Sequence, residues 1–238
     1  MMVRISIFIL LVILAGCTSS TEFPTVPKIE FVKAEYWDMG LQNQDSINIT
    51  IHFQDQQGDL GIFSSENIGP FAAVGYFLDG DQELVTYGHR TRPGFESLPP
   101  YEEPYKCTNY IINPTINNIT VMDTVYFVAN ENHYNFLIDF LIKNSDGTFT
   151  RFPWESYLGY PDCGQSFNGR FEPADLGIDL RKESPIEGNL TYRMLSLGFP
   201  VLLRNKVFKF RIRIKDRGFH TSNVVETPEY TLQDIKEN

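Results

Sequence analysis

The sequence has few of the residues that build soft-ligand metal sites or histidine-based catalytic sites. Its four histidines are scattered along the chain: His52, His89, His133 and His220. No two of them stand at His-x-His or His-x-x-x-His spacing, and no His or second Cys stands at ligand spacing from Cys107 or Cys163. These absences argue against a zinc-type centre.

Basic residues are also fewer than acidic ones. The chain has 20 Lys and Arg against 30 Asp and Glu, which gives a formal net charge of −10. Nucleic-acid binding needs a basic footprint, so we expect no nucleic-acid partner. The one basic stripe, within Lys206–Lys215, is typical of a solvated strand face, and its alternative interpretation is a surface for an anionic glycan or lipid head group.

A hydrophobic run long enough to cross a membrane is missing. The longest one, Ile5–Leu14, has about 10 residues, whereas a membrane-spanning helix needs about 20. It follows Arg4 and precedes Leu14-Ala15-Gly16-Cys17, which resembles the bacterial lipobox, in which the Cys sulfur takes a diacylglycerol. We therefore expect a lipoprotein signal peptide at 1–16. The alternative is an ordinary secretory signal whose Cys later forms a disulfide.

Acylated Cys17 would anchor the protein in the lipid bilayer, since a lipobox Cys normally carries several acyl chains. Residues 17–27 are rich in Ser, Thr and Pro and are typical of a flexible tether. Thr18 after the Cys, with no Asp there, resembles lipoproteins sorted to the outer membrane. Whether the protein faces the periplasm or the cell surface stays open, because Glu22 is the only acid in the tether.

Assigning Cys17 to lipid leaves Cys107 and Cys163. In an oxidising compartment a disulfide between them is the default, and two unpaired thiols are the alternative. The bond would close a loop of about 57 residues and stabilise the fold by about 4 kcal/mol in the chain-entropy model.

The hydrophobic pattern has a period of two almost throughout, which predicts strands, and no stretch predicts an amphipathic helix. The clearest strands are expected at 46–53, 134–143 with a hairpin return at 148–152, and 206–215. Weaker ones are expected at 28–37, 73–78, 83–87, 120–129, 188–195 and 224–232. We therefore predict an all-β protein: a single Ig-like β-sandwich domain at 28–238 with long loops at 91–105 and 153–177.

An acidic, Gly-containing turn directly follows the clearest strand. Asp55, Gln57 and Asp59 are spaced two apart in it, and closely spaced oxygen side chains are what Ca²⁺ needs. In an Ig-like sandwich this loop and the turn at Asp216 would emerge at the same end. Asp55, Asp59 and Asp216 are therefore candidate Ca²⁺ ligands, although no cofactor is required. The alternative is that these residues only form turns.

Three segments resemble a family. They are Phe53–Gly61, Leu98–Tyr101 leading to Cys107 and Tyr110, and Asp216 through Ser222–Glu229. The family is a group of uncharacterised outer-membrane lipoproteins of Gram-negative bacteria. The resemblance covers most of the mature chain and implies an envelope location and an Ig-like fold, but no activity. Members often have Asp where this chain has Gln57.

Three functions remain open. We expect a non-catalytic binding or structural module of the cell envelope, with a protein or glycan partner. The second candidate is a glycan-binding lipoprotein of a polysaccharide-uptake system, with Trp154, Tyr101 and Tyr105 as stacking residues and Trp37 as a further exposed aromatic. The third is a glycoside hydrolase-like enzyme, since the run 96–103 carries three acids, but no acidic pair can be located by sequence.

Overall fold

The computed structural model describes residues 23–40, 43–96, 110–156 and 166–237. Strands make up its regular structure, and they form several antiparallel sheets. The predicted all-β class is therefore confirmed. The predicted signal peptide, Cys17, Tyr101, Tyr105, Cys107 and Cys163 lie outside the described residues, so the lipidation and disulfide assignments stay predictions.

The first sheet has the order β1-β2-β10, with β2 in the centre. Its strands are β1 (Lys28–Trp37), β2 (Asp45–Asp55) and β10 (Ile186–Ser196). The period-two pattern of β2 explains its position, because Ile47, Ile49 and Ile51 are fully buried on one face. A β-bulge at Val32, which has no partner on β2, shifts the register of β1.

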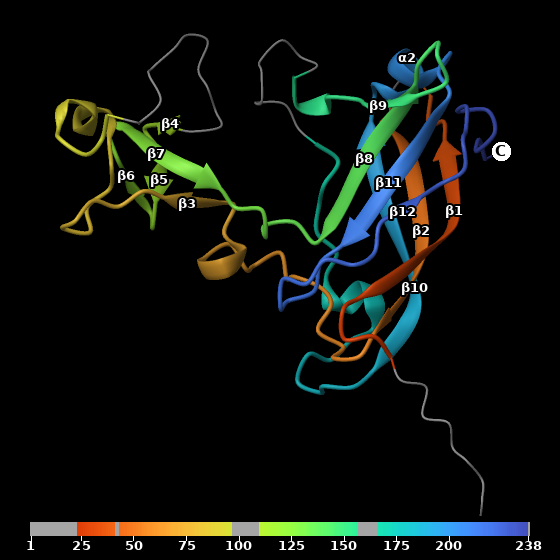
Figure 1. The fold of residues 1–238 in the computed structure, drawn as a ribbon, viewed down its shortest axis with the longest axis horizontal. Helices are drawn as coiled ribbons and strands as arrows, with labels where there is room; N and C mark the ends of the chain where they lie inside the picture. The colour runs from red at the N-terminus through yellow and green to blue at the C-terminus, as the bar shows by residue number, and fades with distance from the viewer. Residues whose placement is uncertain (1–22, 41–42, 97–109, 157–165, 238) are drawn as a thin grey trace, which may run out of the picture.

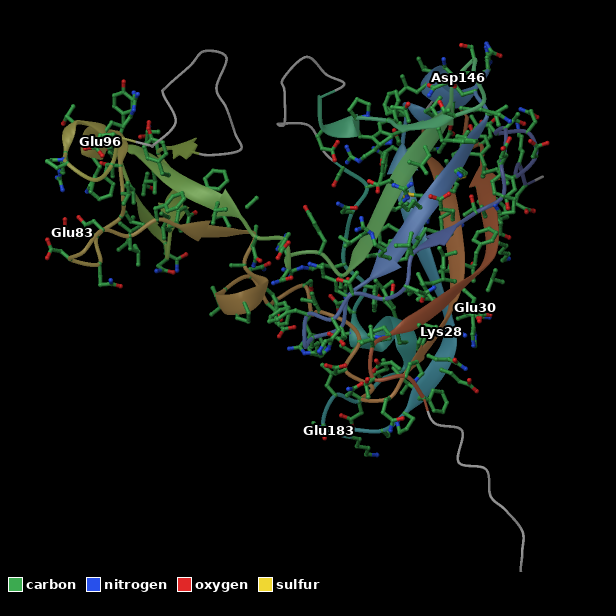
Figure 2. The ribbon with its side chains drawn as sticks, viewed as in Figure 1. Lys28, Glu30, Glu83, Glu96, Asp146 and Glu183 are labelled. Atoms are coloured by element: carbon green, nitrogen blue, oxygen red, sulfur yellow. The ribbon has the colours of Figure 1, made fainter. Side chains whose placement is uncertain are left out.

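The second sheet has the order β12-β11-β8-β9. Its strands are β8 (Phe136–Lys143), β9 (Phe149–Arg151), β11 (Phe208–Ile214) and β12 (Val225–Glu226). The predicted β8–β9 hairpin is confirmed, and Asp146 in its turn accepts the backbone N–H of Thr148. Figure 2 shows Asp146 at the outer tip of this hairpin, and Lys28 and Glu30 on the outside of β1.

The two sheets pack face to face around one hydrophobic core. Figure 1 shows β8 and β11 lying over β2 and β10. Aromatic rings fill it: Phe140 lies 4.9 Å from Phe210 and 5.1 Å from Trp154, measured between ring centroids. Burying one such side chain contributes about 1.5–3 kcal/mol. The core therefore comes from the alternating residues that the sequence pattern identifies.

A smaller group of strands, which we call the small lobe, spans the described residues between 74 and 129. It holds β3 (Val74–Tyr76), β4 (Tyr110–Ile112) and β7 (Thr124–Ala129) in one sheet, and β5 (Thr115–Ile116) with β6 (Ile119–Thr120) in a hairpin. Figure 1 shows it beside the two-sheet body, joined by two connections. Val85 and Tyr126 form its separate core. The sequence pattern did not indicate this subdivision.

Two predicted strands are shorter than expected. Residues 83–87 form only isolated bridges, Leu78 with Leu84 and Thr86 with Val125. The predicted strand 224–232 is reduced to β12, because the Thr227 hydroxyl, rather than a backbone carbonyl, accepts the N–H of Phe210 at 3.0 Å and the following Pro228 has no N–H to donate. Pairing resumes at Tyr230, which bridges Phe208.

Helices are short throughout the described residues. They are α2 (Phe199–Leu203) and the 3₁₀ turns η1 (Gly69–Phe71), η2 (Tyr87–Thr91), η3 (Trp154–Ser156) and η4 (Pro173–Leu176). Among the residues described, none of the helices has the length and apolar character needed to traverse a bilayer.

Candidate metal centre

The acidic turn predicted after the clearest strand lies at one end of the two-sheet body. Asp55 is the last residue of β2, and β11 leads directly into Asp216. An isolated bridge pairs Leu60 with Asp216, and the backbone N–H of Arg217 donates to the carbonyl of Asp59 at 3.1 Å. Two loops far apart in sequence therefore lie side by side, as the sandwich topology predicted.

The three predicted carboxylates converge. One oxygen of each of Asp55, Asp59 and Asp216 lies within 4.8 Å of the others. Because Ca²⁺ binds oxygen at about 2.3–2.6 Å, two oxygens on one ion lie at most about 5 Å apart. The spacing of these three oxygens therefore fits a common cation.

Three oxygens of the loop after β2 are buried without a hydrogen-bond partner among the described residues. Asp55 is fully buried, and its Oδ1 has no hydrogen-bond partner. The buried Oε1 of Gln57 and Oδ1 of Asp59 also lack partners. A buried acceptor without a donor costs about 1–3 kcal/mol, and more when it is charged. Turn formation alone leaves these three oxygens without donors, whereas a cation among the three carboxylates would interact with Asp55 and Asp59.

Glycine fixes the backbone of the loop. Gly58 has φ +68°, its N–H donates to Asp55 Oδ2 at 2.7 Å, and a Cβ there would lie 2.3 Å from the carbonyl oxygen of Ser184. Only glycine avoids both the strained φ and this clash. The loop thereby turns back on Asp55 and holds one of its oxygens in place.

The cluster concentrates negative charge away from water. Burial, together with the charges of Asp59 and Asp216, raises the pKa of Asp55 to about 6 against the pull of the Gly58 N–H. Burial and the charge of Asp216 also raise the pKa of Asp59. Like charges held in a buried cluster disfavour ionisation unless a cation neutralises them.

Asp216 has a partner that sequence reasoning missed. Its Oδ1 accepts the backbone N–H of His220 at 2.7 Å, and its Oδ2 lies 2.8 Å from His220 Nδ1. This hydrogen bond, with the charge of Asp216, raises the pKa of His220. His220 therefore orients the Asp216 carboxylate.

The residues on either side of Asp216 hold both connections to the small lobe. Arg217 forms a bidentate ion pair with Glu66, at 2.6 and 2.8 Å, and donates to the carbonyl of Gly61. Lys215 donates from Nζ to the carbonyl of Glu131 and to the side chain of Asn132. Residue 66 lies on the outgoing connection, and residues 131 and 132 lie on the returning one.

Arg170 reinforces the same junction. Its guanidinium donates to the carbonyls of Phe63, Glu66 and His133, and it also contacts the carbonyl of Phe71. Burial lowers the pKa of Arg170. No short sequence motif could identify this contact, because Arg170 lies 107 residues from Phe63.

Trp154, predicted as a sugar-stacking residue, lies beside other aromatic rings. Its ring packs against Phe140, Phe152, Phe167 and Phe199, with centroid distances between 4.7 and 6.2 Å. The indole is half-buried and packs against the main hydrophobic core, and its stacking role stays a prediction. Tyr101 and Tyr105 lie outside the described residues.

The predicted basic stripe on β11 is largely engaged. Lys209 and Arg211 pair with Glu226 at 2.6 and 2.8 Å, and Arg213 lies 3.8 Å from Asp139. The interpretation as a solvated, ion-paired strand face is favoured over an anion-binding surface.

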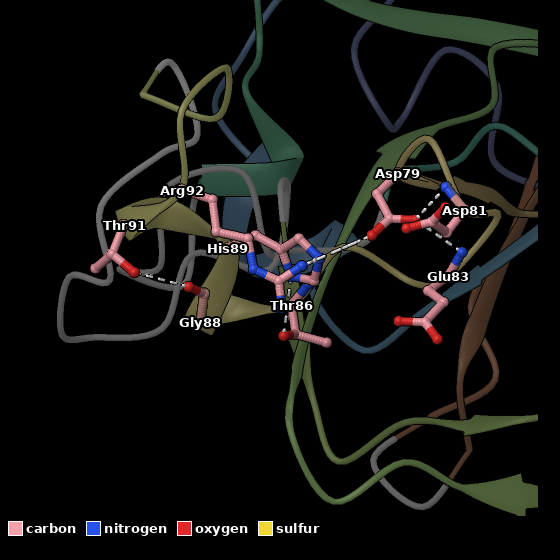
Figure 3. Close-up of polar contacts among 8 residues, drawn as sticks. All are labelled: Asp79, Asp81, Glu83, Thr86, Gly88, His89, Thr91 and Arg92. Carbon is pink, nitrogen blue, oxygen red and sulfur yellow. Dashed lines mark hydrogen bonds and ion pairs between the residues drawn. The ribbon is translucent and has the colours of Figure 1, made fainter.

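A second polar cluster, around His89 in the small lobe, resembles an acid–base pair (Figure 3). The N–H of Thr86 donates to His89 Nδ1 at 3.0 Å, and His89 Nε2 lies 3.3 Å from Asp79 Oδ2 and 3.0 Å from Arg92 Nη1. Asp79 also accepts the N–H groups of Asp81 and Glu83. His89 is only 4% exposed. The cluster therefore closes a turn and leaves no room for a substrate.

Comparison with known proteins gives no assignment: no protein-family profile, curated protein or solved structure matches the chain. A functional inference therefore rests on the geometry of the acidic cluster and its surroundings.

Proposed function

We propose that the protein is a cell-envelope lipoprotein, anchored to the outer membrane through acylated Cys17, with an Ig-like β-sandwich as a non-catalytic binding or structural module. The lipobox at 14–17 and the tether after it support the anchor. Two antiparallel sheets around one core, with β2 and β11 leading to loops at the same end, support the Ig-like assignment.

The module binds one Ca²⁺ ion at the end where these loops meet. Asp55, Asp59 and Asp216 supply carboxylate oxygens, and Gln57 supplies its amide oxygen. The single observation that carries this proposal is the set of three buried, unpaired oxygens on Asp55, Gln57 and Asp59. Ca²⁺ takes 6–8 oxygens, so water or backbone carbonyls would complete the shell.

The ion has a structural role at the junction of the two lobes. Asp216 lies between Lys215 and Arg217, which hold the two connections to the small lobe. Fixing Asp216 therefore limits the movement of both connections. The bound cation would hold the small lobe in one orientation relative to the sheets.

Calorimetry on the protein in detergent tests the ion. We expect millimolar Ca²⁺ to raise the melting temperature over an EDTA-treated sample, and the double variant Asp55→Ala/Asp59→Ala to lose this rise. Asp146→Ala is the matched control, since Asp146 is an exposed turn aspartate whose pKa is lowered by its own Thr148 contacts. An unchanged melting temperature of the wild type in Ca²⁺ would remove the proposal.

A further inference from the structure

The outer face of the β1-β2-β10 sheet carries a small pocket away from the acidic cluster. It is lined by Trp37, Met39, Ser46, Asn48 and Arg193. Two rows of the sheet build it, since Trp37 pairs with Ser46 and Asn48 pairs with Arg193. Side chains on one sheet face stand close together in such rows, so the pocket belongs to regular, rigid structure.

The walls of the pocket are exposed and chemically different from one another. Trp37 and Met39 are 39% and 45% exposed, unlike most large apolar side chains of the sheets. Arg193 is exposed and forms no ion pair among the described residues. Glu35, which lies opposite Asn48 on β1, is already paired with Lys33 at 2.7 Å. Arg193 is thus a free cation beside an indole.

The floor of the pocket is polar. Ser46 is 1% exposed, and the Oδ1 of Asn48 is buried with no hydrogen-bond partner among the residues that the structure describes. A buried amide oxygen without a donor is unfavourable unless a ligand supplies one. A hydroxyl group entering the pocket would do so.

We propose that this pocket binds a sugar ring that carries a carboxylate, as in uronic-acid glycans. The apolar face of a pyranose packs on an indole, its hydroxyls donate to Asn48 and Ser46, and its carboxylate accepts two hydrogen bonds from the guanidinium of Arg193. A polar floor favours a sugar over an apolar peptide side chain, which would leave Asn48 unpaired. The proposal uses none of the residues of the cation site.

Isothermal titration of the protein in detergent with a galacturonic acid tetrasaccharide tests the pocket. EDTA is present throughout, so that a cation cannot bridge the sugar carboxylate to the acidic cluster. We expect binding, at least a tenfold loss of affinity in Trp37→Ala, and a similar loss in Arg193→Gln. Arg181→Gln is the matched control, because Arg181 is 89% exposed and pairs with Asp179.

A neutral galactose tetrasaccharide and an acidic leucine-containing peptide complete the experiment. Weaker binding of the neutral sugar, with the difference removed by Arg193→Gln, supports the role of the carboxylate. Three results would overturn the proposal: no heat with the galacturonic acid tetrasaccharide, unchanged affinity in Trp37→Ala, or binding of the peptide but not the sugar. The last result would make the pocket a protein-docking surface.

Discussion

The backbone N–H of Arg217 donates to the carbonyl of Asp59 at 3.1 Å. This one bond joins the loop that follows β2 to the turn that follows β11, and it sets the two halves of the acidic cluster at a fixed separation.

Gly58→Ala should destabilise the protein more than Gly177→Ala. Both glycines have nearly the same backbone angle, φ +68° and +67°, but only at Gly58 would a Cβ meet another atom, the carbonyl oxygen of Ser184. The shared strain costs about 1 kcal/mol, and the clash at Gly58 adds about 1–3 kcal/mol. Urea denaturation measures both variants, and equal losses would show that the loop relaxes away from Ser184.

Gln57→Asp should strengthen Ca²⁺ binding. The substitution puts a fourth carboxylate where an unpaired amide oxygen now lies. Added charge raises Ca²⁺ affinity, but in the metal-free protein it adds repulsion. We expect a lower melting temperature in EDTA and a larger rise with Ca²⁺ than in the wild type. A variant that loses both stability and the Ca²⁺ response would place Gln57 outside the ligand set.

The metal-free protein should become less stable as the pH rises from about 4 to about 6. The pKa of Asp55 is raised to about 6 in the fold, against about 3.9 in an unfolded chain. The folded state therefore binds the proton more tightly, so the stabilisation is complete below about pH 4 and is lost as the pH rises through 6. One pKa unit corresponds to about 1.4 kcal/mol, so Asp55 contributes about 3 kcal/mol at most.

Denaturation in EDTA across this pH range measures the effect, and Asp55→Asn should flatten the slope because it cannot titrate. With saturating Ca²⁺ the slope should decrease or reverse, since the ion needs the carboxylate form. A slope that survives in Asp55→Asn would assign the titration to another group.

Glu66→Gln should loosen the outgoing connection to the small lobe. It removes the bidentate pair with Arg217, whose guanidinium also lies 4.9 Å from the ring centroid of Phe71. Both side chains of the pair are about three-quarters buried. Removing the pair should therefore lower the free energy of unfolding by more than removing an exposed pair, which typically costs less than about 1 kcal/mol. Hydrogen exchange should increase across residues 62–73.

Glu229→Gln, which removes an exposed pair with Lys143 on the second sheet, is the matched control for that experiment. It should leave exchange at residues 62–73 unchanged. Equal protection in Glu66→Gln and the wild type would show that Arg170 alone holds the connection.

Cys17→Ser should release the protein from the membrane fraction. Ser has no thiol to accept the diacylglycerol, so the variant would lack the acyl chains that contribute about 0.8 kcal/mol per buried CH₂. Mass spectrometry of the wild type should show a diacylglycerol on Cys17 and a peptide pair linking Cys107 to Cys163. A variant that stays in the membrane fraction would point to a different anchor.

The sequence pattern predicted the body of the fold well and the small lobe poorly. Four strands lie close to the predicted residues: β1, β2, β8 and β11. One face of each strand packs on the shared core, and this burial produces the alternation of apolar and polar residues in the sequence. The small lobe has few buried apolar residues, with Val85 and Tyr126 as its core. Its strands of two to six residues leave little periodicity to detect.

The acidic cluster could be predicted because it needed only loop composition and one topological assumption. Strand ends that share an edge of the body bring Asp55 and Asp216 together. Glu66, Arg170 and Lys215 could not be assigned in the same way. Lys215 contacts Asn132 83 residues away, Arg170 contacts the carbonyl of Glu66 104 residues away, and Glu66 pairs with Arg217 151 residues away, so sequence carries no local sign of these contacts.

The chain enters the body beside the acidic cluster, since the N–H of Gln56 donates to the carbonyl of Pro24 at 3.0 Å. The β8–β9 hairpin and α2 lie at the opposite end of the body (Figure 1). A lipid anchor on Cys17, as proposed, would attach to the body through the segment beside the cluster. A force on a bound partner would then be transmitted to the lipid through the segment next to Asp55. A cation there would cross-link the loops after β2 and β11 at the point where such a force enters the fold.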